Sequence, residues 1–195
     1  DKFMKAVIAG EAYELVDPKH GPTGRLVNAR EIWEEILELR KETGEPYLLF
    51  IDSVNKSIPK HHKKLGLHVK MSNLCSEIIL PTGIDHLGKS RTAVCCLSSL
   101  NLEYYEEWKD DKEFIPTIML FLDNVLEDFI NKAPDTMARA KYSAFRERSI
   151  GLGVMGFHSF LQMKKVPIES VMAKVWNKKI FEYVSKEVEE ASVKI

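Results

Sequence analysis

The stretch Ser72-Asn73-Leu74-Cys75-Ser76-Glu77-Ile78 places an amide, a thiol and a carboxylate at every second position. In an extended backbone, side chains alternate between two faces, so Asn73, Cys75 and Glu77 would share one face. At about 3.3 Å per residue the outer two would be roughly 13 Å apart, which suits a sugar-sized pocket. If the stretch is extended, its spacing is compatible with a reactive strand face, although spacing alone does not favour that interpretation. The alternative is a solvent-exposed strand face beside a cysteine packed as a small apolar residue.

Length and composition indicate a globular protein and exclude several classes. The 195 residues, 45% of them hydrophobic, suffice for a core and suggest one domain or slightly more. The net charge of -1 argues against a nucleic-acid partner. The sequence has neither a run of eighteen apolar residues nor a secretory leader. We therefore expect no membrane span and a cytoplasmic location.

The three cysteines are Cys75, Cys95 and Cys96, and they form no C-x-x-C or Cys/His zinc pattern. Structural disulfides and structural zinc are therefore not expected. The chain starts without Met and stops inside a helical pattern that has no stop signal. We expect a piece of a longer protein.

The first half of the chain has an α/β pattern. Asn28 and Glu31 form a capping-box pair before an apolar stripe, and Gly44 is a suitable helix end. The apolar residues 47–51 predict a short, fully buried strand after this helix. Residues 55–70, with adjacent histidines at 61 and 62, predict an exposed basic loop, although metal or phosphate contacts are the alternative.

The second half is expected to be mainly helical, with two apolar strands. The predicted strands cover residues 91–100 and 150–155. Predicted helices begin near Pro116 with a 3.6-residue stripe, span 137–146, and run from about Val171 to the end.

Residues 151–156 match the G-x-G-x-x-G pattern of dinucleotide sites. Here, however, the glycines fall within a predicted strand instead of the turn after one. We expect them to permit close backbone packing. His158, which follows, is expected to be a packed or surface helix residue.

Three segments together resemble the large, catalytic subunit of class I ribonucleotide reductase. They are the motif at 72–78 with Leu80-Pro81-Thr82, residues 93–102 (AVCCLSSLNL), and residues 146–154 (RERSIGLGV). The resemblance extends over essentially the whole chain. It implies a helix-rich, partial segment of that family's ten-stranded α/β barrel, with the motif on the catalytic finger loop. Residues 1–195 would be the central part of the barrel domain, without the N-terminal nucleotide-sensing cone or the C-terminal part.

The resemblance also assigns roles to the motif residues. Cys75 would form the thiyl radical that removes the 3′ hydrogen atom of a ribonucleotide. Glu77 would take the 3′-hydroxyl proton as general base, and Asn73 would hydrogen-bond the ribose hydroxyls, so that both bind the substrate. Cys95 would be one half of the disulfide generated when the 2′-hydroxyl leaves as water.

Cys96, as the strand neighbour of Cys95, is expected to point to the opposite face and into the core. A bulge in the strand would reverse this assignment. The partner cysteine of Cys95, a Pro-Pro-Thr-Ala-Ser-like phosphate-binding segment, two relay tyrosines and a C-terminal cysteine pair have no counterpart here. The isolated chain is therefore not expected to turn over.

The resemblance implies no cofactor and no metal ligand in this chain. The radical would come from a metal-containing small subunit, and the reductant would be an external dithiol of the thioredoxin or glutaredoxin type. Other partners would be a ribonucleoside diphosphate, the remaining parts of the large subunit, and a second large subunit in a homodimer. The alternatives are an adenosylcobalamin-dependent reductase and a non-catalytic interaction module of the same family.

Overall fold

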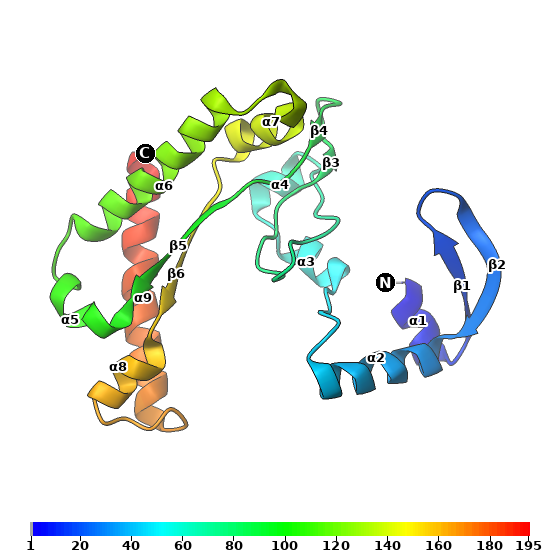
Figure 1. The fold of residues 1–195 in the computed structure, drawn as a ribbon, viewed down its shortest axis with the longest axis horizontal. Helices are drawn as coiled ribbons and strands as arrows, with labels where there is room; N and C mark the ends of the chain where they lie inside the picture. Colours follow the sequence, from blue (N-terminus) through cyan, green and yellow to red (C-terminus); the bar gives the residue numbers. More distant parts are fainter. Residues whose placement is uncertain (1) are drawn as a thin grey trace. The chain divides into compact units, whose positions relative to one another are not determined.

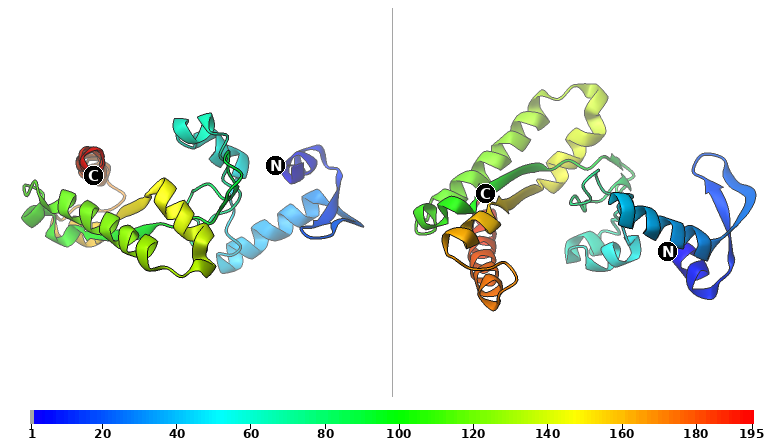
Figure 2. Two further views of the ribbon diagram at one scale, coloured as in Figure 1. Left: turned by 90° about the horizontal axis from the view of Figure 1, so that it is seen from above. Right: turned by 60° about the horizontal axis from the view of Figure 1, so that its bottom comes forward.

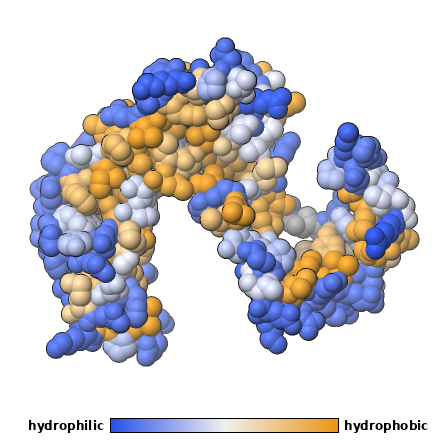
Figure 3. Space-filling view, in the orientation of Figure 1, coloured by the Kyte–Doolittle hydropathy of each residue, from blue (hydrophilic) through white to orange (hydrophobic). Residues whose placement is uncertain are grey.

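The computed structural model describes residues 2–195, and the chain divides into two compact units, Asp1–Ser90 and Arg91–Ile195. Figure 1 shows the elements in chain order, and Figure 2 shows them from two further directions. Both units expose apolar side chains, as Figure 3 shows for one face.

The first unit begins with α1 (Lys2–Ala9), the antiparallel hairpin of β1 (Ala12–Asp17) and β2 (Gly21–Asn28), and α2 (Ala29–Thr43). Neither α1 nor the hairpin was predicted. The hairpin turn is fixed by Asp17, whose carboxylate accepts from the amide nitrogens of Lys19 (2.8 Å) and His20 (2.7 Å). Gly21, at φ 85°, then takes a conformation that other residues rarely adopt.

The predicted limits of α2 are confirmed. The Asn28 side chain accepts from the amide nitrogens of Arg30 and Glu31 and donates to Glu31 Oε1 at 2.9 Å. Gly44 ends the helix at φ 83°. The helix therefore begins and ends where local hydrogen bonding and backbone freedom dictate.

The strand predicted over residues 47–51 is wrong. Residues 47–50 are irregular, Tyr47 and Phe50 are exposed, and Ile51 begins α3 (Ile51–Ser57). A strand gains its backbone hydrogen bonds only from a neighbouring strand. No segment among residues 2–195 pairs with this one, so its apolar residues alone do not make it a strand.

The loop predicted over residues 55–70 is exposed over most of its length, but the prediction of an irregular segment is wrong in part. This segment includes the end of α3 and all of α4 (Lys60–Lys64), and His62 is buried. Asn55 folds it back by accepting from the amide nitrogen of Val69 (2.9 Å) and donating to its carbonyl oxygen (2.8 Å). Ile58, Leu67 and Val69 are buried in this segment, although its composition is mostly polar.

The second unit is built on a parallel pair of strands, β5 (Cys96–Asn101) and β6 (Ile150–Met155). The chain between them forms η1 (Leu102–Tyr104), α5 (Tyr105–Trp108), α6 (Phe114–Lys132), η2 (Asp135–Met137) and α7 (Ala138–Glu147). After β6 follow α8 (Phe157–Met163) and α9 (Val171–Lys194). A parallel pair joined through helices is the connection expected of an α/β fold.

The predicted helices near Pro116, at 137–146 and from Val171 are confirmed, and so is the strand at 150–155. The strand predicted at 91–100 is wrong in its first half. Arg91 ends the two-residue strand β4 (Ser90–Arg91), which pairs with β3 (Gly83–Ile84), and β5 begins only at Cys96.

A buried ion pair interrupts that predicted strand. The Arg91 guanidinium is paired with the Glu147 carboxylate of α7, and its carbon lies 5.5 Å from the centroid of the Tyr142 ring. The amide nitrogen of Thr92 donates to Ser143 Oγ at 2.9 Å, so it bonds a side chain instead of a strand. These contacts attach the segment that leads to Cys95 to α7.

The core of the second unit is an aromatic cluster around Phe160 of α8. The Phe160 ring is edge-on to Tyr105 (5.6 Å between centroids) and to Trp176 of α9 (5.1 Å). Leu102 and Ile180 are fully buried in the same cluster. Residues of α5 and α9, some seventy positions apart in the chain, thus contact one ring.

Within the described residues, no helix combines the length and apolar character that a membrane crossing requires.

Replacing Phe160 by alanine should destabilise the second unit by about 3–5 kcal/mol, because it removes a buried ring and leaves a cavity. Urea unfolding followed by fluorescence of Trp108 and Trp176 measures the change. Phe145→Ala is the matched control, since this α7 ring is 62% exposed and should change stability by about 0.5 kcal/mol or less. Equal losses for the two variants would contradict this description of the core.

Candidate functional site

The motif at 72–78 forms a tight turn, so the predicted extended strand is wrong. The amide nitrogen of Ser76 donates to the carbonyl oxygen of Asn73 at 3.0 Å, and Ser76 has φ 66°. Leu74, 88% exposed, and the exposed Cys75 are the residues between them. Asn and Ser side chains that bond nearby backbone compete with strand pairing, which explains the difference.

The turn brings Asn73 and Glu77 into direct contact. Asn73 Nδ2 donates to Glu77 Oε1 at 2.6 Å, a contact that these side chains could not make if their Cα atoms were roughly 13 Å apart along an extended backbone. Asn73 Oδ1 accepts from the amide nitrogen of Ile78 at 3.0 Å. The three reactive groups are therefore gathered in one loop, although not by the alternation that the sequence suggested.

The orientation of the Asn73 carboxamide follows from its partners. A backbone N–H can only donate, so the atom that faces Ile78 must be the amide oxygen. An ionised carboxylate can only accept, so the atom that faces Glu77 must be the amide nitrogen. Flipping the amide would create two unfavourable contacts, and the carboxylate of Glu77 is therefore held beside an N–H donor.

Cys95 and Cys96 point to opposite faces of the β5–β6 pair, as predicted. A Cβ atom built on Gly151 of β6 would lie 3.7 Å from Cys95 Sγ and 2.4 Å from Leu97 Cδ2, which places both side chains on the face over Gly151. Leu97 is 54% exposed, so this face is open. Cys96 alternates with Leu97 and shares its face with the buried Leu100, but it is only half-buried, so its predicted position in the core is wrong.

The pairing of β5 with β6 is continuous from Cys96↔Ile150 to Asn101↔Met155, so no bulge reverses these faces. Burial raises the pKa of the Cys96 thiol above its ordinary value. A raised thiol pKa means less thiolate at neutral pH, which lowers the reactivity of Cys96.

Gly151 of β6 serves close packing, as predicted, whereas a Cβ on Gly153 would lie 3.5 Å from Ser99 Oγ, an ordinary van der Waals distance. The Leu97 side chain occupies the space that a Cβ of Gly151 would need. Gly156 lies after the strand at φ 75°, where α8 begins. His158 is an exposed residue of α8, in agreement with its predicted surface position.

The sequence did not identify Ser72 and Gly151 as contributors to the site. Ser72 Oγ lies 2.9 Å from the carbonyl oxygen of Ile78 and 3.2 Å from Asn73 Oδ1. The available signal was the Ser-Asn pair, since both residue types readily bond neighbouring backbone groups. Gly151 could be recognised only once the register with β5 was known.

Asn73, Cys75 and Glu77 belong to the first unit and Cys95 to the second. Among residues 2–195, no group of three or more His, Cys, Asp or Glu side chains has the arrangement of a metal site. His61 and His62 contact each other edge-on, with 4.3 Å between ring centroids. The chemistry available is therefore that of a thiol, a carboxylate and an amide.

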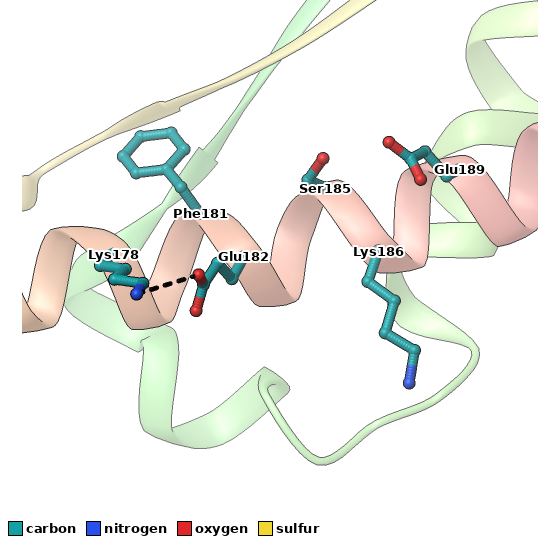
Figure 4. A pocket seen from close by; sticks show the side chains of 6 residues that line it. All are labelled: Lys178, Phe181, Glu182, Ser185, Lys186 and Glu189. Carbon is teal, nitrogen blue, oxygen red and sulfur yellow. Dashed lines mark ion pairs between the residues drawn. The ribbon is translucent and has the colours of Figure 1, made fainter.

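A depression of about 580 Å³ lies along α9 and is lined only by residues between positions 178 and 189 (Figure 4). Phe181 and Lys186 point to opposite sides of the helix, and Lys178 pairs with Glu182 at 3.6 Å. Ion pairs four residues apart are typical of a solvated helix face. This depression contains none of the predicted site residues.

Comparisons with known proteins agree on one family. The family model "Ribonucleotide reductase, barrel domain" matches residues 1–195. A ribonucleoside-diphosphate reductase large subunit of Invertebrate iridescent virus 3 is 46% identical over 183 residues, which are 94% of this chain and 28% of that protein. The Caenorhabditis elegans large subunit is 33% identical over 193 residues, 95% of this chain and 23% of that protein.

Among solved structures, the Actinobacillus ureae class Id ribonucleotide reductase alpha subunit matches with a TM-score of 0.77 at 35% identity. The match covers 98% of this chain and 33% of that chain. The chain thus spans about a quarter to a third of the length of these relatives.

Replacing Asn73 by aspartate should open the loop at neutral pH and let it close on acidification. The new carboxylate keeps an oxygen for the amide of Ile78 but faces the Glu77 carboxylate, so repulsion between like charges replaces a hydrogen bond. The protection of the Ile78 amide, corrected for intrinsic exchange, should fall at about pH 8 and recover towards about pH 5.

Asn131→Asp is the matched comparison for this change. Asn131 Nδ2 also donates to a glutamate, Glu127 Oε1, at 3.0 Å, but Arg148 is paired with the same carboxylate. The cation should reduce the repulsion there, so the protection of α6 amides should depend less on pH. A pH-independent loop in Asn73→Asp would contradict the contact between Asn73 and Glu77.

Proposed function

The chain belongs to the ribonucleotide reductase barrel-domain family. From this we propose that the chain supplies the radical cysteine and the general base for the reduction of ribonucleoside diphosphates. The observation that most directly supports this is the closed loop in which Asn73 contacts Glu77 and Cys75 is exposed. The predicted family and the partial, helix-rich barrel segment are confirmed.

The proposed reaction begins at Cys75. A sulfur-centred radical there takes the 3′ hydrogen atom of the ribose, so that an S–H bond forms as the C3′–H bond breaks. Glu77 removes the proton of the 3′-hydroxyl, and Asn73 positions the hydroxyls through its amide. Sulfur suits the first step because it can hold an unpaired electron and return the same hydrogen atom at the end.

The remaining electrons come from two thiols. The 2′-hydroxyl leaves as water after it takes up a proton, and two thiols are oxidised to a disulfide, which supplies two electrons and two protons. We assign one of these thiols to Cys95, on the open face of the β5–β6 pair. The other thiol would be contributed by the rest of the large subunit, and an external dithiol of the thioredoxin or glutaredoxin type would reduce the disulfide.

The names of the relatives support an assembly with further subunits, since they are described as large or alpha subunits. We therefore propose that the radical comes from a metal-containing small subunit instead of adenosylcobalamin. The other proposed partners are the remaining parts of the large subunit and a second large subunit, with which it would form a homodimer. A cytoplasmic location suits this chemistry because thiols stay reduced there.

The function is tested by mixing the chain with polypeptides that supply the rest of the large subunit, a radical-bearing small subunit, a ribonucleoside diphosphate and a dithiol. Deoxynucleotide should form and should vanish in Cys75→Ser, because a hydroxyl cannot replace the thiol in hydrogen-atom transfer. Cys96→Ser is the matched control, since its thiol faces the core side, and it should retain turnover. Cys95→Ser should stop turnover with the dithiol.

Absence of product from an assembly that demonstrably forms would contradict catalysis. It would favour the alternative that this chain is a non-catalytic interaction module of the family. Loss of turnover in Cys96→Ser with retention in Cys95→Ser would reverse the assignment of the two cysteines.

A further inference from the structure

We propose that Ser72 is a positioning residue, whose hydroxyl closes the base of the motif loop and thereby keeps the Asn73 carboxamide turned towards Glu77. Its importance for turnover rests on the proposed function. Its effect on the loop does not, because the loop is defined by hydrogen bonds that can be measured in the chain itself.

The base of the loop is closed by side chains. Ile78 donates its amide N–H to Asn73 Oδ1 at 3.0 Å, and its carbonyl oxygen accepts from Ser72 Oγ at 2.9 Å. In a hairpin, a strand partner would bind both groups through its backbone. Here the consecutive side chains of Ser72 and Asn73 bind both backbone groups of one residue.

The same hydroxyl also contacts the amide that faces Glu77. Ser72 Oγ lies 3.2 Å from Asn73 Oδ1, and its single proton can go to this oxygen or to the carbonyl of Ile78. A proton donated to Asn73 Oδ1 holds this oxygen directly, whereas a proton donated to the carbonyl of Ile78 fixes the residue whose N–H binds Asn73 Oδ1. The opposite end of the carboxamide, Nδ2, then points to Glu77 Oε1 at 2.6 Å.

Removal of the Ser72 hydroxyl should therefore weaken the hydrogen bond between Asn73 and Glu77, although Ser72 does not contact Glu77 directly. The half-buried carbonyl of Ile78 would lose its donor, and the loss of such a partner is costly when water does not fully replace it. The Asn73 amide would be held by the Ile78 N–H alone and could rotate away from Glu77.

The first measurement is amide hydrogen exchange over residues 72–80 in the chain. Ser72→Ala should speed exchange at Ile78 by roughly two- to tenfold, the range that one ordinary hydrogen bond implies. Ser72→Thr keeps a hydroxyl and should restore slow exchange. Ser53→Ala removes an exposed hydroxyl from α3 and should leave exchange at 72–80 unchanged. Wild-type exchange in Ser72→Ala would overturn the proposal.

The second measurement is turnover in the reconstituted assembly, with Ser72→Ala, Asn73→Ala and the double variant. If Ser72 acts through Asn73, its replacement should lower kcat severalfold in the native background and have little further effect once Asn73 is alanine. Ser72→Thr should restore kcat. Losses that multiply in the double variant would overturn the positioning role.

The two measurements separate this inference from the proposed function. If the wild-type assembly forms no product but Ser72→Ala still speeds exchange at Ile78, the proposed function fails and the loop closure by Ser72 stands. If the wild type turns over and Ser72→Ala changes neither exchange nor kcat, the inference fails and the function stands.

Discussion

The contact on which the candidate site depends is the hydrogen bond between Asn73 Nδ2 and Glu77 Oε1. A carboxylate needs donors, and an amide whose oxygen is already bound to a backbone N–H can offer only its nitrogen. The Asn73 side chain therefore has two roles: it closes the loop without a strand partner, and it orients the carboxylate of Glu77. Cys75 is then displayed at the exposed end of the same loop.

Elements fixed by local rules were predictable from the sequence. Asn28, Glu31 and Gly44 define α2 through hydrogen bonds and backbone freedom that involve no distant residue. The 3.6-residue stripe of α6 and the apolar run of β6 were likewise sufficient. The hairpin β1–β2 was missed although its Asp-to-Gly turn is local, because its strands alternate weakly between apolar and polar residues.

Elements that depend on distant partners were not predictable. Residues 47–51 are apolar enough for a strand but have no partner among the described residues. The segment before Cys95 does not continue the strand, because it is bonded to α7, some fifty residues away. Arg91 pairs with Glu147, and the amide of Thr92 donates to Ser143. The predicted alternation at 72–78 failed for the opposite reason, since side chains bonded the neighbouring backbone.

A cysteine next to a redox-active cysteine could take part in thiol–disulfide exchange and form the wrong disulfide. In the β5–β6 pair this is less favourable, because the side chains of Cys95 and Cys96 lie on opposite faces and the Cys96 thiol is partly buried. Cys95 shares the open face over Gly151 with Leu97, while Cys96 faces the side of the buried Leu100 and its thiol pKa is raised. Thiolates are the attacking species in exchange, so the group with the raised pKa competes poorly at neutral pH. Strand alternation therefore places the thiols of two adjacent cysteines on opposite faces, and the pairing of β5 with β6 has no bulge that would exchange those faces.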